Sequence, residues 1–386
     1  MEPEKDYAYG ERKAPEMPDR ALEPGEGRIT GYLSAALGIM SLLGVICFYY
    51  PSWLTTPELR ELYSVSTLRL ILRISLITSF TLGLVTFIRN KRKRMGAVGV
   101  ICTLVAYLLG GADVPVGELH ETPIAVGMDW LLLDLLRSAI MFIFIEKLFP
   151  KYKEQAILRP GWRTDLSYFT INHLLIGFLL LGANRVVPGL MNWAVNADLQ
   201  GWVRSAPVPL QVVLLIFAAD FFQYWVHRAY HEIPRLWKLH AVHHSTEYMD
   251  WLAGSRNHIV EIFFDRTLSF LPLYLLGPDK GALDAYVLFA SIQAVFVHAN
   301  VNIPFGPLRY LIVTPQYHHW HHSSDKPAID TNYAVHLPLL DWVFGTLHMP
   351  KEHWPLAYGT VTPIPKTLWE QFVYPFTPDE KKSSTD

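Results

Sequence analysis

Residues 208–231 read VPLQVVLLIFAADFFQYWVHRAYH, and this stretch predicts both the fold and the place of the chemistry. Residues 208–226 are almost entirely apolar, and a membrane-spanning helix needs about 20 such residues. His227 and His231 follow at once, four positions apart. On a continuing helix both imidazoles would project from one face. The stretch therefore predicts a spanning helix that ends in a pair of histidines at the membrane boundary.

Seven further apolar runs resemble this one. They cover residues 29–50, 68–88, 96–111, 126–149, 166–187, 259–276 and 282–297. Apolar residues make up 51% of the 386-residue chain and charged residues 18%, against about 25% charged in an average soluble domain. This composition excludes a disordered chain. It predicts an all-α, polytopic membrane bundle of about eight spans.

The distribution of lysine and arginine predicts the orientation. Five basic residues crowd residues 89–94, between the second and third runs, and more follow the fourth run between Lys147 and Arg163. The intervening loops at 51–67 and 112–125 contain a single basic residue, Arg60. Because short cytoplasmic loops are rich in Lys and Arg, both termini and the histidine-rich segments after residue 226 should be cytoplasmic.

Several function classes are excluded by charge and by missing motifs. The formal net charge is −2, so no basic field would attract nucleic acid. The two cysteines, Cys47 and Cys102, lie inside apolar runs and form no CxxC motif. The sequence contains no His-Glu-x-x-His zinc protease motif, no nucleotide-binding glycine loop and no serine nucleophile elbow.

Histidine is the outlier of the composition. Of 16 histidines, 14 lie from His227 onward. Eight of them form three patterns with helical spacing, at 227/231, 240/243/244 and 318/321/322. Imidazole suits iron, zinc, copper and nickel, and eight ligands are too many for one ion but about right for two. The patterns therefore predict a di-metal site in a cytosolic helical cap.

The motifs and their order resemble the fatty acid hydroxylase / sterol desaturase superfamily of membrane di-iron enzymes. They are DFFQYWVHRAYH (220–231), WKLHAVHHS (237–245), RNHIVE (256–261), HANV (298–301), HHWHHS (318–323), NYA (332–334) and DWVFGT (341–346). The likeness covers about residues 130–350, and its lead-in at 146–165 is similar to bacterial members. Ile259 stands where the family often has Pro, and Ala334 where Gly is common.

The resemblance implies two iron ions and O₂ as co-substrate. The implied catalytic ligands are His227, His231, His240, His243, His244, His318, His321 and His322. His258 and His298 match further family histidines and are expected as additional metal ligands, whereas His319 is expected to be a non-ligand. Asp220, Glu261 and Asp341 are the expected carboxylates that orient the imidazoles.

The implied activity is the O₂-dependent hydroxylation or desaturation of a C–H bond in a membrane lipid. A sterol or other terpenoid, a fatty acyl chain, a carotenoid and an ether lipid all remain open as substrates. Electrons should come from an external ferredoxin or from cytochrome b5 with its reductase. Two alternatives stay open: a catalytically inactive member that acts as a membrane scaffold, and a histidine-rich metal transporter.

The expected domain organisation has four parts. They are a disordered N-terminal tail (1–27), an N-terminal transmembrane bundle (28–125), a catalytic domain (126–355) and a C-terminal tail (356–386). The bacterial likeness, together with the lack of a C-terminal KDEL-type signal, favours a bacterial inner membrane over the endoplasmic reticulum.

Overall fold

The computed structural model describes residues 28–120, 122, 125–350 and 353–378. Within these residues the chain is helical and forms no strand, with two isolated β-bridges at Pro150–Val301 and Ser323–Tyr358. The expected all-α class is confirmed. The expected N-terminal tail, 1–27, lies outside the described residues.

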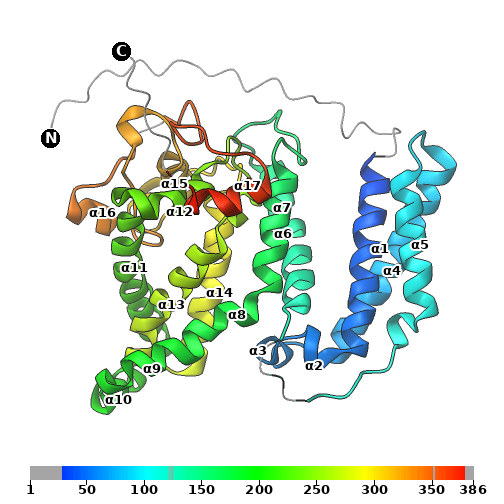
Figure 1. Cartoon of the computed structure of the whole chain (residues 1–386), viewed down its shortest axis with the longest axis horizontal. Coiled ribbons are helices and arrows are strands. Elements are labelled where there is room, and N and C mark those ends of the chain that lie inside the picture. The colour runs from blue at the N-terminus through cyan, green and yellow to red at the C-terminus, as the bar shows by residue number, and fades with distance from the viewer. Residues whose placement is uncertain (1–27, 121, 123–124, 351–352, 379–386) are drawn as a thin grey trace.

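The first part of the chain is a bundle of three long helices (Figure 1). Its helices are α1 (Arg28–Tyr49), α2 (Pro51–Leu54), α3 (Pro57–Arg60), α4 (Val65–Arg89) and α5 (Arg94–Leu108). Small residues bring the long helices together: a Cβ added to Gly99 would lie 2.0 Å from Oγ of Ser34, and one added to Gly38 would lie 2.6 Å from the Gly99 carbonyl oxygen. Such close backbone approach is typical of helices packed inside a membrane.

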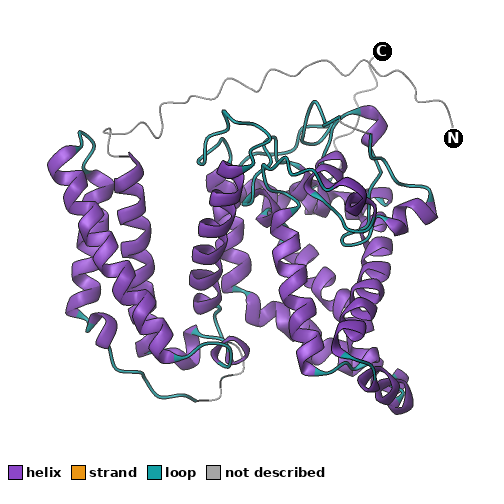
Figure 2. Cartoon of the chain, turned by 180° about the vertical axis from the view of Figure 1, so that it is seen from behind, coloured by secondary structure: helices purple, strands orange, loops and turns teal. Residues whose placement is uncertain are grey.

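The second part surrounds the histidine-rich segments. Its longer helices are α6 (Met128–Leu148), α7 (Trp162–Leu174), α11 (Val208–Glu232), α13 (Ile259–Leu276) and α14 (Lys280–Phe296). At one end of these helices lie α8 (Ile176–Leu181), α9 (Val187–Met191) and α10 (Ala197–Ser205). At the other end lie α12 (Pro234–His244), α15 (Pro315–His321), α16 (Leu339–Phe344) and α17 (Leu368–Val373). Long loops gather at this second end, as Figure 2 shows from behind.

Helix α11 forms the link between the apolar core and the histidines. Its N-terminal half buries Leu215 and Ala219 against Leu273 of α13 and Tyr286 of α14. Farther along, Tyr224 joins a second buried cluster with Val313 and other residues of the loop end. Because this packing fixes α11 along its length, the last turns of the helix hold His227 and His231 in a defined place.

The expectation of eight spans is not confirmed. In the described residues three helices are long and apolar enough to cross a membrane: residues 29–49 in α1, together with α4 and α11. The pair formed by α7 and the following segment, residues 176–194, would make a fourth, bent by 51°. Helix α5 has only 15 residues and rises about 22 Å, less than the roughly 30 Å hydrocarbon thickness. Helix α6 carries five charged residues, including Asp129, Asp134 and Glu146.

The expected span at 166–187 is broken in the structure. Helix α7 ends at Leu174, α8 begins at Ile176, and a π-helical turn, η3, follows at Gly182–Val186. The backbone of Gly127 packs into this bend, since a Cβ there would lie 2.3 Å from the carbonyl oxygen of His173. The apolar pattern predicted a helix here but could not predict its change of direction.

The C-terminal segment that was expected to be a tail from residue 356 packs on the second part as far as it is described. Its helix α17 places the Phe372 ring 5.5 Å from the Tyr168 ring. Lys238 of α12 donates a hydrogen bond to the carbonyl oxygen of Thr377 over 2.7 Å. Residues 356–378 are therefore part of the folded structure, and residues 379–386 lie outside the described residues.

Candidate metal centre

The structure brings nine histidines together in two adjoining groups. The five-histidine group contains His227, His231, His240, His244 and His321. The four-histidine group contains His243, His298, His318 and His322. In each group the potential ligand atoms all lie within 4.8 Å of one another. The nine residues come from segments spread over almost 100 positions of the sequence.

Helical geometry explains how neighbouring residues serve different groups. His243 and His244 are adjacent on α12, and so point in directions about 100° apart. His240 and His244 share one face of α12 and belong to the five-histidine group. The His244 and His322 rings stack with centroids 4.4 Å apart. The two groups are therefore in direct contact through these rings.

Hydrogen bonds fix the tautomers of several histidines. A backbone carbonyl can only accept, so a ring nitrogen that faces one carries the proton. Nδ1 of His227, His321, His243 and His298 donates to the carbonyl oxygens of Tyr333 (2.7 Å), Thr331 (2.9 Å), Arg256 (3.1 Å) and Ala294 (2.8 Å), respectively. The Nε2 atom of each of these neutral rings is then an unprotonated donor to a metal.

These Nε2 atoms converge at distances that suit a shared ion. His298 Nε2 lies 3.3 Å from Nε2 of His243 and 2.9 Å from Nε2 of His318. In the other group, His227 Nε2 lies 3.0 Å from Nε2 of His240. Two lone pairs that face each other repel, whereas a cation between them attracts both. With metal–nitrogen bonds of about 2.1 Å, two ligands at a right angle stand about 3 Å apart.

Burial keeps the imidazoles neutral. It lowers the pKa of His298 to about 4 and places the pKa of His243, His318 and His322 well below its usual value near 6.5. Neighbouring histidines push in the same direction, because a second positive charge nearby is unfavourable. At neutral pH these rings are unprotonated at one nitrogen, which is the form that binds a metal.

The donor set fits iron. Imidazole nitrogens bind iron, zinc and copper, but zinc sites in proteins are almost always tetrahedral, with three or four protein ligands. Five nitrogens exceed a tetrahedral set. The five-histidine group would therefore suit an ion that accepts more than four ligands, such as iron, and the four-histidine group would supply nitrogen donors that iron also accepts.

Carboxylates orient two histidines of the five-histidine group. Glu261, an expected orienting residue, lies with Oε1 2.5 Å from Nδ1 of His240. Asp330, which the sequence analysis missed, accepts a hydrogen bond from Nδ1 of His231 over 3.3 Å. Nothing in the spacing of Asp330 pointed to this contact, because it lies 99 residues from its partner.

Asp220 and Asp341, the other two expected orienting carboxylates, contact no metal-group histidine ring among the hydrogen bonds of the described residues. Asp220 accepts from the backbone N–H groups of Val335, His336 and Leu337. Asp341 accepts from those of Tyr333 and Ala334. Both carboxylates therefore hold the loop that contains Tyr333, whose carbonyl oxygen orients His227.

Two other histidines lie outside both groups. His258 was expected as a ligand, but its Nε2 faces the carbonyl oxygen of Phe372 at 3.2 Å, while its Nδ1 accepts from the N–H of Val260 at the start of α13. The residue matches the family motif yet serves as a helix cap and as a contact of the C-terminal segment. His319 lies with Nε2 3.2 Å from the Ala299 carbonyl oxygen and belongs to neither group.

Comparisons with known proteins agree on the family. A model of the fatty acid hydroxylase family matches residues 212–346. An ornithine lipid hydroxylase of Rhizobium tropici is 33% identical over 184 residues, which are 47% of this chain and 55% of that protein. An alkylglycerol monooxygenase of Danio rerio is 32% identical over 278 residues, which are 67% of this chain and 61% of that protein.

A more distant match is a very-long-chain aldehyde decarbonylase of Arabidopsis thaliana, 27% identical over 157 residues, or 38% of this chain and 24% of that protein. The chain thus covers little more than half the length of the first relatives that it matches. No solved structure matches it. The family match spans α11 to α16 and encloses all nine clustered histidines. The chain belongs to the fatty acid hydroxylase / sterol desaturase superfamily, with residues 212–346 as its fatty acid hydroxylase domain.

Proposed function

We propose that the protein is a membrane di-iron monooxygenase that uses O₂ to hydroxylate an unactivated C–H bond of a lipid. The observation that carries the proposal is the convergence of unprotonated Nε2 atoms in two adjoining groups. No amino-acid side chain can oxidise such a bond, so a metal and O₂ must do so. The names of the relatives, an ornithine lipid hydroxylase and an alkylglycerol monooxygenase, support a lipid as substrate.

Bound iron would supply the activation of O₂ and the removal of hydrogen from carbon. The protein's own residues would hold the ions at fixed positions through Nδ1 hydrogen bonds. Seven of the nine clustered histidines are buried, and His227 and His231 are partly buried, which limits the access of water. Helices α11 and α13 lead from the apolar core to the centre. We propose that the lipid chain reaches the centre along these helices, from the bilayer.

The balance of the reaction requires a reductant. Inserting one oxygen atom into a C–H bond while the other leaves as water consumes two electrons and two protons. The fold of the described residues is helical throughout, and the sequence has no flavin fingerprint. We therefore propose an external electron donor, a ferredoxin or a cytochrome b5 with its reductase, which docks on the cytoplasmic side. The same side would hold both termini, in a bacterial inner membrane.

An isotope experiment distinguishes the proposal from its rivals. Iron-loaded protein with reductant, ¹⁸O₂ and membrane lipids should give a lipid product that contains one ¹⁸O atom. A desaturase would instead place the label in water and give an alkene. An inactive scaffold or a metal transporter would give no oxidised lipid. The His243→Ala and His321→Ala variants, one for each histidine group, should insert into the membrane and form no product.

A further inference from the structure

Two different loops contact the two histidine groups: residues 330–333 provide acceptors for three rings of the five-histidine group, and residues 254–256 lie against two rings of the four-histidine group. We infer that each group has its own support, and that each support governs how tightly its own ion is held. The inference depends on the proposed binding of two metal ions. It assigns positioning roles to Asn332 and Asp220 for the five-histidine group, and to Asp165 and Ser245 for the four-histidine group.

A single short loop supports the five-histidine group. Residues 330–333 provide acceptors for three of its five rings. These are the side chain of Asp330 for His231, and the carbonyl oxygens of Thr331 and Tyr333 for His321 and His227, respectively. Since a ring pivots about its Cα–Cβ and Cβ–Cγ bonds, a fixed acceptor on Nδ1 sets the direction of Nε2. A displacement of this loop would therefore misdirect three ligands of the same ion together.

Asn332 fixes the loop from inside. It is fully buried, and its amide nitrogen donates to the carbonyl oxygens of Tyr317 and His348, at 3.1 and 2.7 Å. Its side-chain oxygen accepts from the N–H of His348 over 2.7 Å. The backbone of Asn332 has a φ of 61°, and that of Asp330 a φ of 57°. Such left-handed conformations of non-glycine residues persist only where the surroundings hold them.

Asp220 and Asp341 fix the same loop from its C-terminal side. Together they accept from five consecutive backbone N–H groups, those of residues 333–337, over 2.6–3.1 Å. The loop is thus bound at successive positions to α11 and α16, the helices that carry the two carboxylates.

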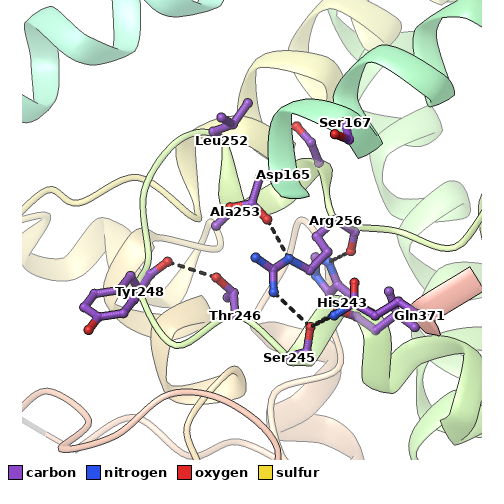
Figure 3. Close-up of polar contacts among 12 residues, drawn as sticks. Asp165, Ser167, His243, Ser245, Thr246, Tyr248, Leu252, Ala253, Arg256 and Gln371 are labelled. Atoms are coloured by element: carbon purple, nitrogen blue, oxygen red, sulfur yellow. Dashed lines mark hydrogen bonds and ion pairs between the residues drawn. The ribbon is translucent and has the colours of Figure 1, made fainter. Parts of the chain in front are cut away.

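A different loop supports the four-histidine group. The carbonyl oxygen of Arg256 accepts from Nδ1 of His243, and a Cβ added to Gly254 would lie only 2.7 Å from Nδ1 of His298. The guanidinium of Arg256 donates to Asp165 over 2.5 Å and to Oγ of Ser245 over 3.0 Å, and Gln371 of α17 donates to the same oxygen (Figure 3). Residues 254–256 thus lie against two ligands of one ion.

A buried ion network anchors this second loop. Arg159 pairs with Asp165 at 2.6 Å and with Asp250 at 2.7 Å, and the three side chains are almost completely buried. Asp250 also accepts from the N–H groups of Leu252 and Ala253. Its anchors lie in the 159–165 segment and in the loop itself. The anchors of the 330–337 loop lie on α11 and α16, and Asn332 adds contacts to the backbone of Tyr317 on α15 and of His348. Sites without shared partners act nearly additively.

The test measures retention of iron in variants in which one group lacks a histidine and therefore releases its ion before the intact group does. His298→Ala leaves the five-histidine group as the intact one, and His231→Ala leaves the four-histidine group. Each is combined with Asn332→Gly, which removes the buried amide but allows positive φ, or with the isosteric Asp165→Asn. Purified protein in detergent is challenged with a chelator, and the iron left per chain is followed by mass spectrometry.

The inference predicts opposite results in the two backgrounds. With His298→Ala, Asn332→Gly should speed iron loss by about 10- to 100-fold, the usual effect of losing an outer hydrogen-bond partner, and Asp165→Asn should leave the loss rate within about twofold. In the His231→Ala background, Asp165→Asn should speed iron loss by about 10- to 100-fold, and Asn332→Gly should leave the loss rate within about twofold. Asp220→Asn and Ser245→Ala give milder variants of the two supports, for use where the first variants do not elute as folded protein in gel filtration.

Three outcomes would overturn the inference. Equal acceleration by both support variants in both backgrounds would show one shared support. No acceleration by any of the four support variants would show that neither loop positions ligands. Loss of both ions on substitution of a single histidine would show that the groups do not hold ions separately. Failure of the wild-type protein to bind iron would contradict the proposed function instead.

Discussion

At the scale of single residues, the contact between Glu261 and His240 shows how the protein shapes its ligands. Both side chains are buried, and the carboxylate oxygen lies 2.5 Å from Nδ1. A carboxylate partner fixes the ring and makes its other nitrogen a stronger donor to metal. The sequence motif identified Glu261 as such a partner. It identified Asp220 and Asp341 too, but these act through a loop, and sequence spacing cannot reveal a contact that passes through backbone N–H groups.

Replacing Glu261 with Gln should lower the iron affinity of the five-histidine group. The amide can still contact His240 but lacks the charge, so iron affinity at the five-histidine group should fall by about 10- to 100-fold. Competition with a chelator measures this affinity. Glu247→Gln is the matched control, since Glu247 is exposed and pairs with Lys366 at the surface. Equal affinities of Glu261→Gln and wild type would contradict the assigned role.

His336 should make the protein sensitive to acid. Burial lowers its pKa to about 4, while its Nδ1 contacts Oε1 of Gln293 over 2.6 Å. Between pH 6.5 and pH 4, His336 is protonated in the unfolded chain but stays neutral in the folded protein. The free energy of unfolding therefore falls as the pH drops towards 4. The full effect is about 3 kcal/mol. Above pH 6.5 the residue contributes no pH dependence.

Thermal unfolding in detergent between pH 7 and pH 4 checks this expectation. The variant His336→Asn keeps a donor for Gln293 but cannot titrate in this range. It should lose less stability than the wild-type protein over the same pH interval. Parallel losses in the two proteins would show that His336 is not the group responsible.

At the scale of elements, close packing of α1 against α5 depends on glycine. Because a Cβ at Gly99 would lie 2.0 Å from Oγ of Ser34 and 2.4 Å from the Ser34 carbonyl carbon, Gly99→Val must push the helices apart. Overpacking of this kind costs about 1–3 kcal/mol or more. Thermal unfolding should show the loss, while iron retention stays unchanged, because the histidines lie in the other part of the chain.

Gly44→Ala provides the control for that variant. Gly44 also lies on α1, but an added Cβ would meet only Cδ1 of Leu72, at 3.8 Å, which is ordinary contact. This variant should unfold at the wild-type temperature. If Gly99→Val unfolded at the same temperature as Gly44→Ala, this would contradict the close packing of α1 against α5 at Gly99.

The apolar pattern predicted where helices form better than how they end. Runs at 208–226, 259–276 and 282–297 became α11, α13 and α14, because a helix lets an apolar segment satisfy its backbone N–H and C=O groups internally. The break between α7 and α8 has no signal of its own in the sequence. It depends on packing with the backbone around Gly127, a contact that only the folded chain makes.

At the scale of the whole molecule, the distribution of Lys and Arg predicts that the histidine groups and the basic loop at 89–94 lie on the same side of the membrane. The structure places the histidine-bearing ends of α11, α12 and α15 at the same end as the turn between α4 and α5 (Figure 1). If this end is cytoplasmic, a cysteine introduced by Lys91→Cys should react with an impermeant thiol reagent only after cells are opened. Glu118→Cys should react in intact cells, because the backbone of Glu118 accepts a hydrogen bond from Ser52 of α2, which follows the opposite end of α1. The reverse pattern would invert the topology.

The sequence predicted most of the histidines that the structure brings together, but not how they divide between two groups. Periodicity placed His240, His243 and His244 on one broad helical face, and the structure separates His243 from its neighbours. That division depends on where α15 and His298, which follows the end of α14, meet α12 in space. His258 shows the opposite failure, since a motif match suggested a ligand and the fold uses the residue as a helix cap.

The most direct test of the central claim is the iron content of the detergent-purified protein, combined with Mössbauer spectroscopy of protein grown on iron-57. Nine converging histidines in two groups predict about two irons per chain and a spin-coupled pair. His243→Ala and His321→Ala should each lower the content. One ion or none after anaerobic reconstitution with iron, or two uncoupled ions, would contradict the di-iron centre.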